Sequence, residues 1–402
     1  MTTPTDPRPL DGIRVIEIGQ LLAGPFAGTM LAYFGAEVIK VEPPGAGDPI
    51  RGWRILDDEG TAFWWRSLGR NKQSVTANLR SATGREVVKD LMRTADVVIE
   101  NFKPGTLEKW GLGPDDLHAE NPDLIFARIS GYGQDGPNAS KPGYASVTEA
   151  YSGFRYVNGF PDGVPVRPNL SIGDTVAGIH AVLGILLSLL ERQQGRGTGG
   201  QVVDVALYEA MFNLMEGMVP EFSGAGVVRE PSGSTLTGIV PTNTYLCGDG
   251  KHVVIGANGD SIYQRLMHAM GKPEMASDPR YANNAGRVVH QDMIDGTIAV
   301  WTASLTSEAV ISTLEAADVP VGPIYSVADM MNDPHYQARE LFEEHTTPTG
   351  NITLPAILPK LSKSPGRTTW PGGEVGMHTD EVLKSLGYSA ERIAQLREAA
   401  DI

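Results

Sequence analysis

The first half of the chain alternates short apolar runs with segments whose apolar residues recur at helical spacing. Buried strands are expected at four such runs, residues 13–18, 37–42, 96–100 and 124–130. Helices are expected at residues 26–34 and from Thr83, where TGRE has the spacing of a capping box. Strand, helix and strand repeated with short loops predict an α/β fold, with a parallel sheet covered on both faces.

The second half of the chain has a different pattern. Glycine, serine and proline accumulate between residues 224 and 238, which indicates an exposed connection. A strand at 251–257 and helices at 261–270 and 306–317 predict a smaller α+β domain. We place this domain at residues 236–320, between linkers at 206–235 and 321–350. A pair of C-terminal helices is expected to begin near His378.

The longest apolar run, Val176–Leu190, is interrupted by His180 and Ser188. Fifteen residues rise about 22 Å as a helix, which is short of the roughly 30 Å hydrocarbon core of a bilayer. We therefore expect a buried core helix and no membrane partner.

The composition narrows the possible partners and compartments. A net charge of −15 argues against nucleic acid, which requires clustered lysine and arginine. Cys247 is the only cysteine, so intramolecular disulfides and thiolate metal sites are excluded. No apolar stretch opens the chain, and we therefore expect a cytoplasmic protein without a signal peptide.

Several common catalytic motifs are absent from the sequence. The eight histidines are scattered without HExxH spacing, so we expect no metal site. There is no GxxxxGK[ST] loop, no GxGxxG after the first strand and no GxSxG. Phosphate-loop, NAD-dependent and serine-hydrolase chemistry are disfavoured, which leaves carboxylates and basic residues as candidates.

Asp174 is the most informative carboxylate, because it stands where the long apolar run begins. It fits the N-cap of a buried helix, where its side chain would accept a backbone N–H. It equally fits a nucleophile, because the partial positive charge of a helix N-terminus keeps a carboxylate ionised and oriented. The local pattern favours the cap, and the two roles are compatible.

Basic and aromatic residues gather in three stretches, at residues 47–53, 70–75 and 100–113. The last follows a predicted strand, at the sheet edge where open α/β proteins bind ligands. There Asn101 could hydrogen-bond a ligand, Phe102 could stack on a ring, and Lys103 and Lys109 could meet phosphate. The alternative is a loop with solvated lysines. Arg167 could hold a substrate carboxylate, although a surface role is commoner for arginine.

Eight stretches in one order along almost the entire chain resemble the family III CoA-transferases, the group that includes formyl-CoA and carnitine CoA-transferases. They are residues 9–53, 71–75, 95–112, 129–137, 141–153, 171–186, 195–210 and 376–387. The resemblance implies a large Rossmann-like domain built from both chain ends, residues 1–205 and 351–402, a parallel sheet within it, and an interlocked homodimer.

The resemblance also implies that Asp174 is the nucleophile. Its carboxylate would attack a donor acyl-CoA, giving a mixed anhydride and then an aspartyl-CoA thioester, and an acceptor acid would reverse these steps. Residues 167–178 resemble most the relatives that use succinyl-CoA and small dicarboxylic acids. CoA is then a substrate, and no permanently bound cofactor is expected.

By the same resemblance, eight further residues are assigned to ligands. The CoA-binding positions are Asn101, Phe102, Arg80, Lys109 and Ala77. The substrate-binding positions are Arg167, Tyr144 and Leu22.

Three alternatives to a dicarboxylate CoA-transferase stay open: a formyl-CoA or carnitine type of CoA-transferase, a racemase, and a CoA-binding protein. Leu22 and Pro43 replace a glutamine and an arginine of the formyl-CoA enzymes, which disfavours formyl substrates. An α-methylacyl-CoA racemase would use Asp174 as a base with a histidine partner, but Tyr144 stands in that segment. The third alternative is a protein that binds CoA without turnover.

Overall fold

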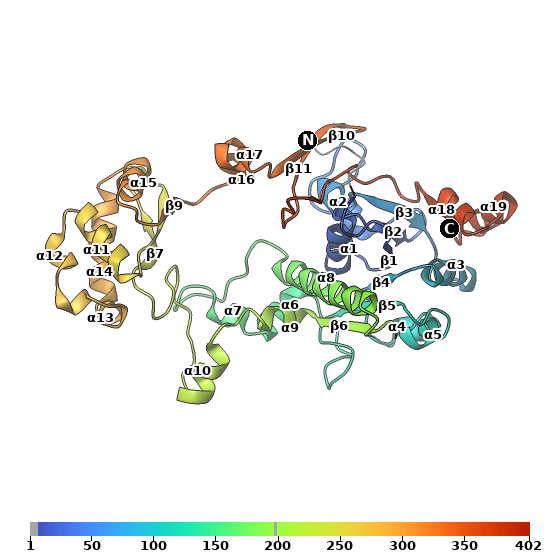
Figure 1. Ribbon diagram of the computed structural model, residues 1–402, viewed down its shortest axis with the longest axis horizontal. Coiled ribbons are helices and arrows are strands. Elements are labelled where there is room, and N and C mark those ends of the chain that lie inside the picture. The colour runs from blue at the N-terminus through green and yellow to red at the C-terminus, as the bar shows by residue number, and fades with distance from the viewer. Residues whose placement is uncertain (1–6, 197–198) are drawn as a thin grey trace. The chain divides into compact units, whose positions relative to one another are not determined.

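The computed structural model describes residues 7–196 and 199–402, which divide into two compact units (Figure 1). The large unit contains the described residues of 7–154, 168–216 and 337–402. The small unit contains residues 155–167 and 217–336. The large unit therefore draws on both ends of the chain.

Six parallel strands form the sheet of the large unit, in the order β3-β2-β1-β4-β5-β6. Their bounds are β1 Arg14–Glu17, β2 Glu37–Glu42, β3 Lys72–Thr76, β4 Val97–Glu100, β5 Ile125–Ser130 and β6 Val202–Ala206. In the central register Val15 pairs with Val38 on one side and with Val97 on the other. The strand order reverses direction between β1 and β4, and ligands of open α/β sheets bind at such a point.

Helices cover both faces of this sheet, and its inner strands β4 and β5 are accordingly buried on both sides. The helices of the large unit are α1 Ala23–Tyr33, α2 Phe63–Leu68, α3 Ala82–Arg93, α4 Thr106–Lys109, α5 Pro114–His118, α6 Ala145–Tyr151, α8 Ile172–Gln193, α9 Leu207–Phe212, α18 Thr379–Ser385 and α19 Ala390–Glu398, with the 3-10 turn η1 Pro49–Gly52. Ile16 and Val98 pack in one core cluster with α3, α18 and α19. Val15 and Val97 pack in the other with α1 and α8.

The α/β class predicted from the sequence is confirmed. However, every strand of the six-stranded sheet lies between residues 14 and 206. The C-terminal part contributes α18 and α19, red in Figure 1, and the hairpin of β10 Phe342–Thr347 and β11 Gly350–Pro355. The large unit thus draws on both chain ends, as the resemblance implies, but the C-terminal end adds helices and a hairpin and no strand of the described six-stranded sheet.

The small unit is α+β, as the sequence indicates. Its antiparallel sheet has the order β7-β8-β9, with bounds Thr242–Leu246, His252–Gly256 and Val321–Pro323. Its helical elements are α10 Met218–Ala225, α11 Asp260–Ala269, α12 Pro273–Ala276, η2 Pro279–Tyr281, α13 Asn284–Val289, α14 Gln291–Ala303, α15 Ser307–Ala316 and α16 Val327–Asn332. Two short helices, α7 Phe154–Val157 and α17 Pro334–Ala338, span the unit boundaries.

Several expected boundaries differ from the observed ones. The segment 155–167 lies in the small unit instead of the large one. The two expected linkers contain structure, because α9 and α10 lie in 206–235, and β9, α16, α17 and all of β10 lie in 321–350. These elements are one or two turns or a few residues long, too short for hydrophobic periodicity to reveal. The helix expected from Thr83 is α3, and its cap is Ser81, whose hydroxyl accepts from Gly84 N at 2.9 Å.

The apolar run forms the 22-residue helix α8. Its buried face contains Ala177, Ala181 and Ile185, and Gly178 lies so close to α1 that a Cβ there would sit 3.0 Å from the Ala23 carbonyl oxygen. By length and composition alone α8 could cross a membrane, as core helices of soluble proteins also could. The prediction of a core helix is confirmed for its inner face.

Candidate active site

Two cavities lie at the carboxyl ends of strands β1 to β5 in the large unit. They adjoin, because Gln20 and Phe102 line both. We name them the Asp174 cavity, of about 340 Å³, and the Arg80 cavity, of about 630 Å³. Their position at the switch between β1 and β4 is where the strand order predicts a ligand.

The Asp174 cavity brings together residues from loops after three strands and from the first turn of α8. Its lining residues are Gln20, Leu21, Leu22, Ala23, Asn101, Phe102, Lys103, Pro104, Ile129, Ser130, Gly131, Lys141, Pro142, Gly143, Tyr144, Asp174 and Leu207. Five of the sequence-assigned residues therefore share this cavity: Asp174, Asn101, Phe102, Tyr144 and Leu22. Lys103 and Lys141 supply its cations.

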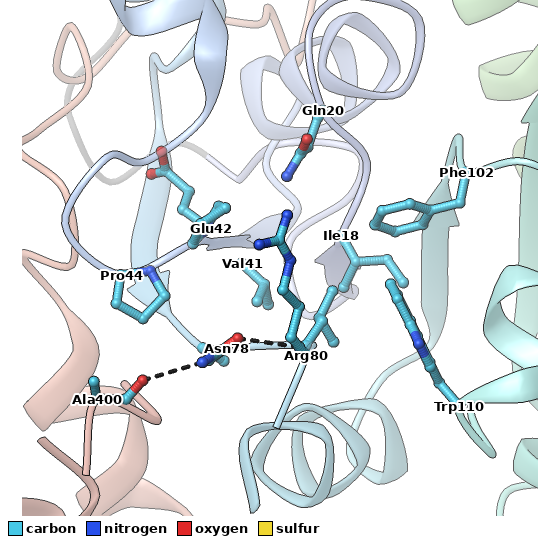
Figure 2. A pocket seen from close by; sticks show the side chains of 13 residues that line it. Ile18, Gln20, Val41, Glu42, Pro44, Asn78, Arg80, Phe102, Trp110 and Ala400 are labelled. Carbon is cyan, nitrogen blue, oxygen red and sulfur yellow. Dashed lines mark hydrogen bonds between the residues drawn. The ribbon is translucent and has the colours of Figure 1, made fainter. Parts of the chain in front are cut away.

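The Arg80 cavity contains the other CoA candidates that the structure brings together. It is lined by Ile18, Gln20, Val41, Glu42, Pro43, Pro44, Ala77, Asn78, Leu79, Arg80, Phe102, Trp110 and Ala400. Figure 2 shows the Arg80 side chain extending among these residues, with Phe102 and Trp110 on the opposite wall. The two rings meet edge to face with centroids 5.6 Å apart. An exposed guanidinium beside aromatic rings suits a nucleotide-like anion.

Two assigned residues lie outside these cavities. Lys109 is exposed at the end of α4 and lines neither cavity, whereas its neighbour Trp110 lines the larger one. Arg167 belongs to the small unit, and its role stays a prediction. Sequence reasoning missed Trp110 and Lys141, although both lie in stretches that carry the family resemblance.

Asn101 uses its amide on the protein backbone. Gln20 N donates to Asn101 Oδ1 at 2.8 Å, and Asn101 Nδ2 donates to the Gln20 carbonyl at 2.7 Å. A Cβ at Gly19 would sit 2.8 Å from Asn101 Oδ1, so only glycine allows this approach. Asn101 thus fixes the loop after β1, and the simple interpretation of its amide as a free ligand donor is incomplete.

The first turn of α8 positions Asp174. The N-cap is Ser171, which makes no side-chain cap hydrogen bond, and Asp174 is an acidic residue of the first turn. The interpretation of Asp174 as the cap is therefore wrong. Gly173 N donates instead to the buried Glu149 Oε1 at 3.3 Å, from helix α6. Asp174 is half-buried, and its place in the first turn puts its carboxylate at the positive end of the helix dipole.

Six fully or nearly buried charges lie beneath the loops of the two cavities, and we call them the charge cluster: Glu17, Lys40, Glu42, Asp48, Arg51 and Lys72. Lys40 Nζ lies 3.0 Å from Glu17 and 2.8 Å from Asp48, and Lys72 Nζ lies 2.7 Å from Glu17. Arg51 donates twice to Glu42, at 2.7 Å each. The cluster contains three cations and three anions, so its formal net charge is zero.

The charge cluster corrects the interpretation of residues 47–53 and 70–75 as ligand-binding cations. Arg51 and Lys72 are buried and paired with carboxylates, and Arg70 donates to the carbonyls of Ser67 and Pro355 at 2.7 Å. Burial lowers the pKa of Lys72 to about 8 against the attraction of Glu17. Burial also opposes the charge of Lys40, but Asp48 and Glu17 outweigh it and raise the pKa of Lys40.

Among residues 7–196 and 199–402, no group of three or more His, Cys, Asp or Glu side chains could hold a metal ion. What the described site offers is a carboxylate in a partly apolar cavity, next to a wider cavity with an arginine and two aromatic rings. This arrangement suits covalent chemistry on an acyl group carried by a nucleotide.

A family model for CoA-transferase family III matches residues 10–379. The chain belongs to this family. The resemblance found in the sequence is confirmed, and the protein is an enzyme of the CoA-transferase type.

Relatives of this family III CoA-transferase are similar over almost their whole length. The succinyl-CoA–D-citramalate CoA-transferase of Chloroflexus aurantiacus is 46% identical, over 99% of each chain. The succinate–glutarate CoA-transferase of Agrobacterium fabrum is 35% identical, over 95% of this chain and 97% of its own. The crystal structure of a CaiB/BaiF family protein from Brucella suis has a TM-score of 0.84 and 32% identity, and covers 94% of this chain and 100% of its own.

Proposed function

We propose that this CoA-transferase moves CoA from succinyl-CoA to a small dicarboxylic acid. The observation that carries the proposal is the half-buried Asp174 in the first turn of α8, inside a cavity that adjoins the Arg80 cavity. The names of the two relatives, which concern citramalate and glutarate, support the substrate class.

The proposed reaction proceeds through covalent intermediates on Asp174. Its carboxylate attacks the donor thioester carbonyl, the carbon–sulfur bond breaks, and CoA thiolate leaves a mixed anhydride. The thiolate then attacks the aspartyl carbonyl, which releases the donor acid and forms an aspartyl-CoA thioester. The acceptor carboxylate attacks this thioester, and CoA thiolate attacks the acceptor carbonyl of the second anhydride. Asp174 and the new acyl-CoA are released, with no net redox change.

In this proposal each cavity binds a different part of the donor succinyl-CoA. The nucleotide end lies in the Arg80 cavity, with phosphate at Arg80, a ring against Phe102 and Trp110, and Ala77 in the wall. The thioester lies at Asp174, with Leu22 and Tyr144 around the acyl group and Lys141 as an available cation. For Lys109 and Arg167, the roles suggested by the resemblance stay predictions.

We also propose a homodimer, interlocked as the resemblance implies. The outer face of α8 is apolar and exposed: Ile179, Leu183 and Leu187 are 46%, 53% and 58% accessible. An apolar surface of this kind on a core helix suits coverage by a second copy of the chain. The cytoplasmic location expected from the sequence also stays a prediction.

Trp110 tests the proposed position of the nucleotide. Trp110→Ala should raise the KM for succinyl-CoA about tenfold with little change in kcat, because the ring contributes binding that is equal in ground and transition states. Steady-state kinetics in succinyl-CoA provide the measurement. Trp301→Ala is the matched control, because Trp301 is also partly buried but packs against the core of the small unit; it should leave this KM unchanged. Equal KM changes in both variants would place the nucleotide elsewhere.

The substrate proposal is tested by incubating the protein with succinyl-CoA and, in turn, citramalate, malate, glutarate, mesaconate and itaconate. At least one new acyl-CoA, separated by chromatography, is the expected result. If no acid accepts CoA from succinyl-CoA but one accepts it from formyl-CoA, the donor is formyl-CoA and the proposed substrate class is wrong. Exchange of an α-proton without transfer would indicate a racemase, and tight CoA binding without either reaction would indicate a non-catalytic binder.

A further inference from the structure

The loop Gly19–Leu22 after β1 is a shared wall of the two cavities. Gln20 lines both, and Leu21 and Leu22 line the Asp174 cavity. Leu21 has a φ of +65°, in the left-handed region that a leucine side chain disfavours. Such a conformation persists only where the surroundings impose it, and it is often found at functional sites.

Three side chains impose the conformation of this loop. Leu21 N donates to both carboxylate oxygens of Asp48, at 3.1 Å each. Lys40 Nζ donates to the Gly19 carbonyl at 2.6 Å, and Lys40 and Asp48 are paired at 2.8 Å. Asn101 holds Gln20 through its paired amide hydrogen bonds. The strained backbone of Leu21 is therefore held by the buried carboxylate of Asp48.

Asp48 connects the charge cluster to the loop Gly19–Leu22. It is 1% exposed and also accepts from Ile50 N at 3.0 Å, as the cap of η1. A cap of a single 3-10 turn needs one oxygen and no ion pair with Lys40. The second set of contacts, to Leu21, acts on the wall of the Asp174 cavity.

We propose that Asp48 is a positioning residue of the transfer reaction, which holds the Leu21–Leu22 wall so that water is kept from the aspartyl-CoA thioester. This inference rests on the proposed function. In the reaction to be prevented, water attacks the aspartyl carbonyl and the carbon–sulfur bond breaks. CoA leaves as the thiol, and the Asp174 carboxylate and a proton are released. Leu22 is 9% exposed and apolar, and together with Leu21 it excludes water from this side.

The test compares Asp48→Asn with Asp57→Asn. Asparagine has nearly the same shape as aspartate but no charge. Its amide N–H group would face the Lys40 ammonium, which removes the ion pair and weakens the hydrogen bonds from Leu21 N. Asp57 is the matched control: it is buried, lies 2.9 Å from Arg66, accepts from Thr61 N at 2.9 Å and lines neither cavity. Both variants lose a buried ion pair in the same unit, and only Asp48 touches the loop.

The readout is the ratio of succinyl-CoA hydrolysis, measured as free thiol without acceptor, to CoA transfer, measured with the acid that the wild type uses. This ratio should rise at least tenfold in Asp48→Asn and stay within twofold in Asp57→Asn, although both variants lose thermal stability. Equal ratios in the two variants would overturn the proposal and leave Asp48 as a structural residue.

Leu21→Gly keeps the proposal testable if Asp48→Asn does not fold. Glycine accepts a φ of +65° without strain, so this variant should fold while opening the apolar wall. Its hydrolysis-to-transfer ratio should also rise at least fivefold, and an unchanged ratio would contradict the proposed wall. A wild-type protein that transfers no CoA from any donor contradicts the proposed function itself, which separates the two failures.

Discussion

Asp174→Ala should reduce CoA transfer by at least about a thousandfold, because the variant has no carboxylate to accept the acyl group and then the CoA. Initial rates of acyl-CoA formation from succinyl-CoA provide the measurement. In the wild type, hydroxylamine added after succinyl-CoA should convert Asp174 to a hydroxamate that peptide mass spectrometry detects. The variant should give none.

Asp115→Ala is the control for this experiment. Asp115 is also an acidic residue in the first turn of a helix, α5, but it is exposed and lines neither cavity. Its replacement should leave the rate within twofold of the wild type. A transfer rate in Asp174→Ala above about a tenth of the wild-type rate would exclude Asp174 as the nucleophile.

Gly28→Ala should destabilise the large unit by about 3 kcal/mol or more, because the helix α1 passes directly over the charge cluster. A Cβ at Gly28 would sit 1.9 Å from Glu17 Oε2, and Glu17 is held between Lys40 and Lys72. Glu17 can give way only by breaking one of these buried ion pairs. Denaturant unfolding followed by far-UV circular dichroism provides the measurement.

The sign of this effect is informative, because alanine is normally the better residue inside a helix by about 1 kcal/mol. Gly296→Ala in α14 is the matched control: this glycine is exposed, and a Cβ there would meet nothing within 4 Å. The control should gain stability where Gly28→Ala loses it. A gain in both variants would mean that Glu17 relaxes without cost.

The large parallel sheet was predictable from local pattern where its strands are apolar on both faces. β2 begins and ends at the expected residues, and β1, β4 and β5 differ by about one residue at their ends. Strand β3 was missed because its sequence, KQSVT, is polar. Lys72 lies in the interior there only because Glu17, from another strand, pairs with it, and no local pattern contains that partner.

The candidate site was only partly predictable, because the roles of its residues also depend on partners that lie far away in the sequence. Asp174 stands out beside an apolar run, but its first-turn position depends on Glu149 of α6, which binds the preceding backbone N–H. Cations near aromatic residues looked alike in the sequence. Arg80 faces a cavity, whereas Arg51 stacks 3.7 Å over Trp65 and pairs with Glu42 in the interior. Only tertiary contacts separate an arginine that lines a cavity from one that pairs in the interior.

The division of the large unit along the chain has a consequence during synthesis. The last strand of its sheet ends at Ala206, but the helices α18 and α19 that complete the cover of one face begin at Thr379. At roughly 5–20 residues per second, about 170 residues take on the order of ten to thirty seconds to translate. During that time the sheet has already been synthesised, but part of one of its apolar faces has no helices to cover it. We therefore expect chaperones to bind the nascent chain at this stage, and we expect a ribosome stalled before α18 to leave an aggregation-prone fragment.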